Sequence, residues 1–350
     1  MKDLRSVNKA IIFCAGLLLL ASCARDKGSP KEERPSARAT GSPETAPAAS
    51  AKGAAKRSPA SAETPSAASL TVSSSSAPGA KLSIEPKVVE RGSPCLFTLT
   101  VPDALSSLDG SLMGKKVFFN SDQSRKTWYG LAGIGLESAL GGQPLTLKGS
   151  DANGHPVAFN AHFEIEARKA NIRVPPEFTN PDDEDRARIA RDAILKRGAF
   201  KTLSTMALWD GPFLRPVDPG VRLTAVFSGT RRFNSGPVKV HRGVDFGAPQ
   251  GTPIKAINNG RVILARNMFY DGNLVAIDHG QGLLSLYLHL SRMDVKEGDP
   301  VSAGQPIGLS GSTGRSSGPH LHLQIKWAGT DIDPQELMAL RLPSNLVKND

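Results

Sequence analysis

The sequence predicts a mainly β protein, and two observations support this prediction. First, 34 glycines and only 5% aromatic residues in a chain of 350 favour short strands and tight turns over long helices. Second, short apolar or alternating runs recur with turn residues between them, and strands do not alternate with helices as in a parallel sheet. The chain is longer than one ordinary domain, so we expect two domains and a separate N-terminal part.

Residues 1–22 have the pattern of a bacterial signal peptide. Basic residues precede an apolar run over residues 10–20, about half of the ~20 residues that a membrane-spanning helix needs. The run ends in Leu-Ala-Ser-Cys, which resembles the bacterial lipobox and implies cleavage before Cys23 and a lipid on its thiol. The alternative is a cysteine that merely closes a leader. Because Ala24 follows, we expect an exported, membrane-anchored lipoprotein on the periplasmic face of the outer membrane if the host is Gram-negative.

Residues 23–80 predict a disordered linker. Ser, Ala, Pro, Thr and Gly dominate, and Leu70 and Val72 are almost the only large apolar residues, so the segment cannot build a core. The chain has a net charge of +10, and between Ala24 and Ala80 eight Lys and Arg are dispersed among five acids. Such dispersed charge is typical of a solvated linker. Because no basic stripe occurs, we expect no nucleic-acid partner.

Residues 81–175 predict a β-sandwich-like domain. Its strands are indicated by four runs at strand period: residues 95–99, 116–119, 145–147 and 162–166. Residues 176–210 predict a helical connector. Acids open a run after Asn180, and two basic residues close it before Gly198.

Residues 211–340 predict a glycine-rich antiparallel β domain, followed by a tail at 341–350. Turn signals such as Asn-Asn-Gly at 258–260 and Asp-Gly-Asn at 271–273 separate its short apolar runs. The runs cover residues 253–257, 261–264, 274–277, 283–290, 306–309 and 320–327.

Five of the seven histidines lie between His241 and His322. Residues i and i+2 of a strand share a face, so His320 and His322 point the same way. His241 and Asp245 also share a face if their segment is extended. Two such strands side by side would bring two or three N and O ligands together. Two histidines and one aspartate leave zinc an open fourth position for water, as a catalytic site requires.

Three motifs in this region resemble those of the lysostaphin/LytM-type (M23) zinc metalloendopeptidases: His241-x-x-x-Asp245, Tyr287-x-His289-Leu290 and His320-x-His322. The resemblance covers about residues 211–337. It implies that His241, Asp245 and His322 bind one Zn²⁺ per chain. It also implies an enzyme that hydrolyses peptide bonds in the cross-links or stem peptides of peptidoglycan.

The same resemblance implies that His289 and His320 are catalytic. No His-Glu-x-x-His helix supplies a glutamate base, so these imidazoles are the available acid and base groups. Tyr287, two residues before His289, is either a hydrogen-bond donor to substrate or a core residue. We expect His279 to order a turn, with Asp278 as a candidate partner of a metal ligand.

Three alternatives compete with this interpretation. Gly-x-Ser-x-Gly at 314–318 suggests a serine nucleophile at Ser316, but the strand-turn-helix context of that motif is missing. Residues 295–308 resemble the hairpin of biotinyl and lipoyl carrier domains without their modified lysine. Some LytM-type domains are non-catalytic regulators that have lost metal ligands and activate cell-wall amidases. All three ligands occur here, which favours the enzyme. We expect loops 228–239 and 266–273 to decide which peptidoglycan bond is cut.

Overall fold

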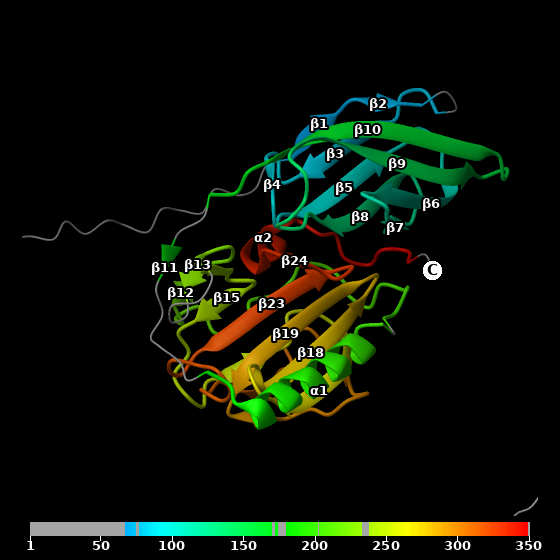
Figure 1. Ribbon diagram of the computed structural model, residues 1–350. Helices are drawn as coiled ribbons and strands as arrows, with labels where there is room; N and C mark the ends of the chain where they lie inside the picture. The colour runs from blue at the N-terminus through cyan, green and yellow to red at the C-terminus, as the bar shows by residue number, and fades with distance from the viewer. Residues whose placement is uncertain are drawn as a thin grey trace, which may run out of the picture. The chain divides into compact units, whose positions relative to one another are not determined.

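The computed structural model (Figure 1) describes residues 67–74, 77–169, 172–173, 180–201, 203–232 and 238–348. This part of the chain contains twenty-four strands and two helices, so the prediction of a mainly β protein is confirmed. Neither of these helices is long and apolar enough to cross a membrane. The expected signal peptide, Cys23 and most of the expected linker lie outside the described residues.

The first ten strands form one sheet in the order β1-β3-β5-β8-β7-β6-β9-β10-β2, with β4 beside β10. Strand β7 pairs with β6 through residues 115–118 and with β8 through residues 119–121, so β7 changes its partner strand after residue 118. The bounds are β1 Ala68–Leu70, β2 Val72–Ser73, β3 Lys81–Glu85, β4 Val89–Glu90, β5 Pro94–Thr100, β6 Leu105–Leu112, β7 Lys115–Ser121, β8 Thr127–Gly133, β9 Gly141–Asp151 and β10 Pro156–Glu166.

The two halves of this sheet enclose a core, because each strand presents one apolar face. In β10 every second residue is buried, as expected for a strand with one face toward solvent. Phe97 of β5 and Phe163 of β10 meet in this core with ring centroids 5.7 Å apart. All four runs from which the sequence predicted this domain lie in strands.

The predicted linker extends too far toward the C-terminus. The sequence predicts a linker over residues 23–80, but strands β1 and β2 lie inside that range. They pair with β3 and β10 respectively. Leu70 and Val72, its two large apolar side chains, pack partly buried against the core. Two apolar residues suffice here because the neighbouring strands supply both the hydrogen bonds and the apolar surface, which composition alone does not reveal.

The C-terminal domain is built on an eight-stranded sheet in the order β12-β15-β23-β19-β18-β17-β21, with β24 beside β23. All its strand pairs are antiparallel, as predicted. Smaller sheets, β16-β22-β20 and β11-β13-β14, accompany it, and β11 runs parallel to β13. The bounds are β11 Ile172–Arg173, β12 Leu223–Ala225, β13 Thr230–Arg232, β14 Val238–Val240, β15 Val244–Phe246, β16 Pro253–Lys255, β17 Gly260–Met268, β18 Gly272–Gly280, β19 Leu283–Leu290, β20 Arg292–Met293, β21 Pro300–Val301, β22 Pro306–Leu309, β23 Leu321–Trp327 and β24 Thr330–Ile332.

Strand β19 lies at the centre of this sheet and is buried over its whole length, so both of its faces are covered. Leu283 and Tyr287 join the main core on one face. Leu284, Leu286 and Leu288 form a second apolar cluster on the other, against which Phe200 and Leu203 pack after helix α1.

Helix α1 (Asp183–Ala199) begins as the sequence predicts. The side chain of Asp182 accepts a hydrogen bond from the backbone N–H of Asp185, and the Asp185 carboxylate accepts one from the backbone N–H of Asp182. This reciprocal capping box satisfies two N–H groups that the first turn leaves without helical partners. The second helix, α2 (Pro334–Ala339), begins after Asp333.

Two predicted boundaries differ from the structure. Trp209, assigned to the connector 176–210, is buried in the core, and its backbone N–H donates to His279 O at 3.1 Å. The predicted tail 341–350 is packed as far as it is described, because Leu342 is buried and Val347 exchanges two backbone hydrogen bonds with Ser121. Both segments are short, and their burial comes from distant strands that local sequence does not indicate.

Candidate metal centre and active site

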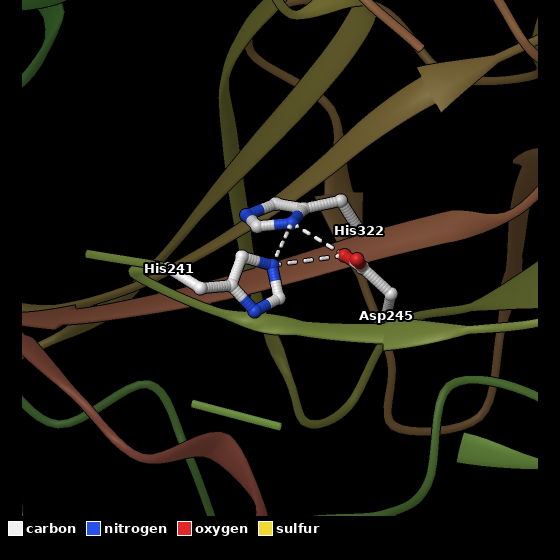
Figure 2. A group of neighbouring side chains, drawn as sticks. All are labelled: His241, Asp245 and His322. Carbon is white, nitrogen blue, oxygen red and sulfur yellow. Dashed lines mark hydrogen bonds and ion pairs between the residues drawn. The ribbon is translucent and has the colours of Figure 1, made fainter. Parts of the chain in front are cut away.

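Three predicted ligands meet where β15 lies beside β23. The register places Asp245 directly opposite His322, and His241 precedes β15 by three residues. Figure 2 shows the three side chains pointing toward one another. His322 Nδ1 lies 2.8 Å from Asp245 Oδ1, and His241 Nε2 lies 3.0 Å from each of these atoms. The predicted juxtaposition of two strands is therefore present.

A glycine between the first two ligands makes this approach possible. A Cβ at Gly243 would lie 2.7 Å from His322 Nε2 and would overlap the backbone oxygen of Leu323. Any side chain at this position would push β15 away from β23. The His-Arg-Gly-Val-Asp run thus contributes a close backbone approach as well as its two ligands.

The other nitrogen of His241 determines which atom faces the cluster. Nδ1 lies 2.8 Å from Val226 O, and a carbonyl can only accept, so Nδ1 carries the proton. In the neutral ring, Nε2 then presents a lone pair to Asp245 Oδ1 and to His322 Nδ1. Acceptor atoms that face one another at 2.8–3.0 Å require a proton or a cation between them. This arrangement fits a bound metal ion.

The protonation states also suit metal binding. Burial alone would raise the pKa of Asp245, but the adjacent His241 and His322 rings outweigh burial and hold that pKa far below its usual range. Burial lowers the pKa of His322, against the attraction of the Asp245 carboxylate. An ionised carboxylate and a neutral imidazole are the forms that bind metals. Two nitrogens and one oxygen, all within 4.8 Å of one another, could hold a divalent transition metal.

The two predicted catalytic histidines lie beside these ligands. The rings of His289 and His320 have centroids 4.8 Å apart, and the His289 ring lies 6.2 Å from that of His322. His320 Nε2 is 3.9 Å from Asp245 Oδ1. His320 precedes β23, contrary to the predicted strand 320–327, and forms an isolated bridge with Gly311. The structure therefore brings all five predicted site residues together.

Loop residues 310–320 hold both of these rings through backbone oxygens. His289 Nδ1 donates to Thr313 O at 2.9 Å, and His320 Nδ1 donates to Gly318 O at 2.8 Å. Each Nε2 is thereby left with a lone pair while its ring is neutral. Burial first, and then the nearby His320 and His322, lower the pKa of His289 to about 4, so this ring is neutral at pH 7. The sequence does not indicate these carbonyl contacts, because a backbone acceptor leaves no residue-type signal.

His289 has a φ of 64°, a backbone conformation that residues other than glycine rarely adopt. Its orientation therefore departs from the regular strand face that it was expected to share with Tyr287. Tyr287 is fully buried, and its hydroxyl accepts a hydrogen bond from the backbone N–H of Ile257 at 2.9 Å. Of the two predicted roles for Tyr287, the core role is confirmed and contact with substrate is wrong.

His279 lies apart from the site, within β18. Its Nδ1 donates to Asn259 O at 2.7 Å, and its Nε2 lies 2.7 Å from Ser285 Oγ. Complete burial lowers its pKa to about 4. The expected turn role is wrong. The hydrogen bonds of Asp278 that the structure describes involve none of the predicted ligands. Its carboxylate accepts from the backbone N–H groups of Ser204 and Gly280.

Ser316 lies in the loop between β22 and β23, and no helix follows it before β23. Its hydroxyl donates to Gly318 O at 2.7 Å and lies 3.3 Å from His320 Nδ1. The context of a nucleophile elbow is therefore absent here, as the sequence analysis expected.

Comparison with known proteins agrees with this geometry. Residues 239–334 match the profile of Peptidase family M23. A crystallised putative M23 peptidase from Pseudomonas aeruginosa shares 29% identity and a TM-score of 0.53. That match covers 70% of this chain and 93% of the other.

Two curated relatives each match about a third of the chain or less. Peptidoglycan DD-endopeptidase ShyA of Vibrio cholerae is 44% identical over 120 residues, which are 34% of this chain and 28% of that protein. DD-carboxypeptidase/endopeptidase Mpg of Neisseria meningitidis is 43% identical over 96 residues, 27% of this chain and 22% of that protein. The chain therefore matches less than a third of the length of either relative.

Proposed function

We propose that this protein is a zinc-dependent endopeptidase that hydrolyses peptide bonds in peptidoglycan cross-links or stem peptides. The observation that carries the proposal is the convergence of three ligand atoms beside two further imidazoles. The names of the relatives ShyA and Mpg, both DD-peptidases, support the substrate class.

One zinc ion per chain would be held by His241 Nε2, Asp245 Oδ1 and His322 Nδ1. When bound, zinc polarises the scissile carbonyl and lowers the pKa of a bound water toward 7. The contact between His241 Nδ1 and Val226 O fixes the tautomer that such binding needs.

The chain supplies proton transfer through His289 and His320. Either Nε2 can accept the proton of the attacking water and return it to the departing amine. Gly318 O holds the His320 ring and would stabilise its protonated form, since it accepts the Nδ1 hydrogen in both states. Thr313 O does the same for His289. These fixed carbonyls mean that the rings need not reorient during proton transfer.

The cellular setting is a proposal from the sequence. We propose export, a lipid on Cys23 and a periplasmic location on the outer membrane if the host is Gram-negative; the anchor lies outside the described residues. Fatty-acid labelling of the wild type and of Cys23→Ser tests the anchor, and equal label in both would contradict it. The alternative regulator of cell-wall amidases is supported by no feature of the site, because all three ligands are in place.

Digestion of purified walls tests the enzymatic proposal. We expect the zinc-loaded protein to release new amino termini from peptidoglycan, with the cut bond identified by mass spectrometry of the products. Walls of several chemotypes, with direct diaminopimelate cross-links and with glycine bridges, will define the substrate. If the zinc-loaded chain cuts none of them while increasing the activity of an added amidase, the regulator is the better description.

A further inference from the structure

Helix α1 approaches the peptidase domain through a stripe of polar side chains. Arg188, Asp192 and Lys196 are spaced at i, i+4 and i+8, so they lie along one side of the helix. The helix itself contains no buried residue. Its apolar attachment comes after its last turns, where Ala199, Phe200 and Leu203 pack on the outer face of the sheet. The stripe can therefore be altered without removing apolar packing.

Each member of the stripe contacts an alternate residue of the segment 267–271, which comprises the end of β17 and the turn that leads to β18. The contacts are Arg188 Nη2 to Asn267 Oδ1 at 2.6 Å, Phe269 N to Asp192 Oδ2 at 2.7 Å and Lys196 Nζ to Asp271 Oδ2 at 2.5 Å. This regular pairing attaches the helix to this segment at three successive points. Figure 1 shows α1 in front of β18 and β19, and the helix also contacts β17.

Asp271, the last residue of this segment, holds His289. Asp271 uses its side chain for Lys196 and its backbone oxygen for the backbone N–H of His289, at 2.8 Å. This bond fixes the backbone of His289 at its positive φ, a conformation that persists only when its surroundings impose it. On the other side, Thr313 Oγ1 accepts from Asn273 N at 2.9 Å while Thr313 O accepts from the His289 ring. One residue, Asp271, thus links the helix to a candidate catalytic group.

We propose that Lys196 and Asp192 are positioning residues, through which helix α1 holds the segment 267–271 and Asp271 of this segment holds His289. The effect on turnover rests on the proposed function, whereas the mechanical link does not. Among the described residues, Lys196 is the side chain of α1 that holds the Asp271 carboxylate. Without this ion pair, the backbone oxygen of Asp271, which accepts the hydrogen bond from His289 N, is no longer fixed in place. Small displacements of a catalytic group reduce the rate steeply, because proton transfer needs a defined distance and angle.

The test compares Lys196→Met with Arg197→Met in the full chain. Arg197 is exposed and neighbours Lys196 in the last turn, so both substitutions remove one positive charge from the same helix end. We expect faster amide hydrogen exchange at His289 in Lys196→Met, with zinc content and thermal melting unchanged. With wall peptides as substrate, kcat should fall about tenfold at nearly constant KM, the usual effect of losing a group that orients a site residue. Arg197→Met should match the wild type.

Lys196→Arg should restore most of kcat and of the exchange protection, since a guanidinium can also reach a carboxylate. Equal exchange at His289 in the two Met variants would overturn the link. A raised KM at unchanged kcat would also overturn it, because the helix would then act on substrate binding. If exchange responds as expected but the wild type cuts no wall, the link holds and the proposed function fails.

Discussion

The two sides of the site are constructed differently. His241, Asp245 and His322 come from β15, β23 and the residues just before β15, and strand register places their atoms. His289 and His320 lie at a strand end and before a strand, and backbone oxygens of one loop orient them. Register is determined by many hydrogen bonds, whereas the loop orients each ring by one or two. Metal binding and proton transfer should therefore be separable by mutation.

The largest expected effect follows from removing a ligand. His322→Ala deletes one of three protein donors and leaves Asp245 buried with one partner fewer, so zinc affinity should fall by more than ~100-fold. Activity on wall peptides should fall to background. Metal analysis and cleavage assays check this, with thermal melting of the zinc-free proteins as the control for folding. Full zinc occupancy in this variant would mean that His322 is not a ligand.

His320→Ala should impair proton transfer and leave metal binding intact. Its Nε2 is 3.9 Å from Asp245 Oδ1, too far for a hydrogen bond, so the ligand cluster does not depend on it. We expect about one zinc per chain and a rate lower by about 10²–10⁴, the usual contribution of a positioned acid or base. The same metal analysis decides it: loss of zinc here, with retention in His322→Ala, would reverse the two assignments.

Gly243→Ala tests whether strand approach places the ligands. The new Cβ would lie 2.7 Å from His322 Nε2 and overlap Leu323 O, so β15 must move away from β23. We expect zinc affinity to fall about 10- to 100-fold while the His289 and His320 rings keep their hydrogen bonds. Competition with a chelator measures the affinity. Gly251→Ala is a control for adding a methyl group, since its Cβ would meet nothing within 4 Å, although its φ of 89° adds local strain. An unchanged zinc affinity in Gly243→Ala would show that β15 tolerates a wider spacing.

The last expected effect concerns His279, a buried histidine outside the site, and bears on stability and not on activity. Burial lowers its pKa from 6.5 to about 4, so above pH 6.5 both the folded and the unfolded protein carry it neutral. As pH falls from 6.5 to 4, the unfolded chain binds a proton that the folded chain does not, and the free energy of unfolding decreases by about 3 kcal/mol. Urea unfolding of zinc-free protein at several pH values measures this loss. His279→Gln should show a shallower decrease than the wild type; equal slopes would contradict the assignment.

The sequence was sufficient to predict that His241, Asp245 and His322 cluster and insufficient for the orientation of the His289 and His320 rings. Two-residue periodicity correctly placed His322 beside Leu321 and Leu323, which are buried in the core. It failed for His320, which lies before β23, and for His289, whose positive φ takes it out of the strand face of Tyr287. Both failures occur where regular pleating ends, and a period-based argument has no information there.

The sequence by itself determined the class of fold, the capped start of helix α1 and the family whose motifs the histidines share. These depend on local patterns: strand period, helix capping and the spacing of ligands within one segment. Only the tertiary structure decided that Leu70 and Val72 join the sheet, that the C-terminal residues pack against Trp209 and Ser121, and that Asp271 links a helix to His289. Such contacts join residues far apart in the chain through backbone groups, which every residue type presents alike, so no residue pattern marks them.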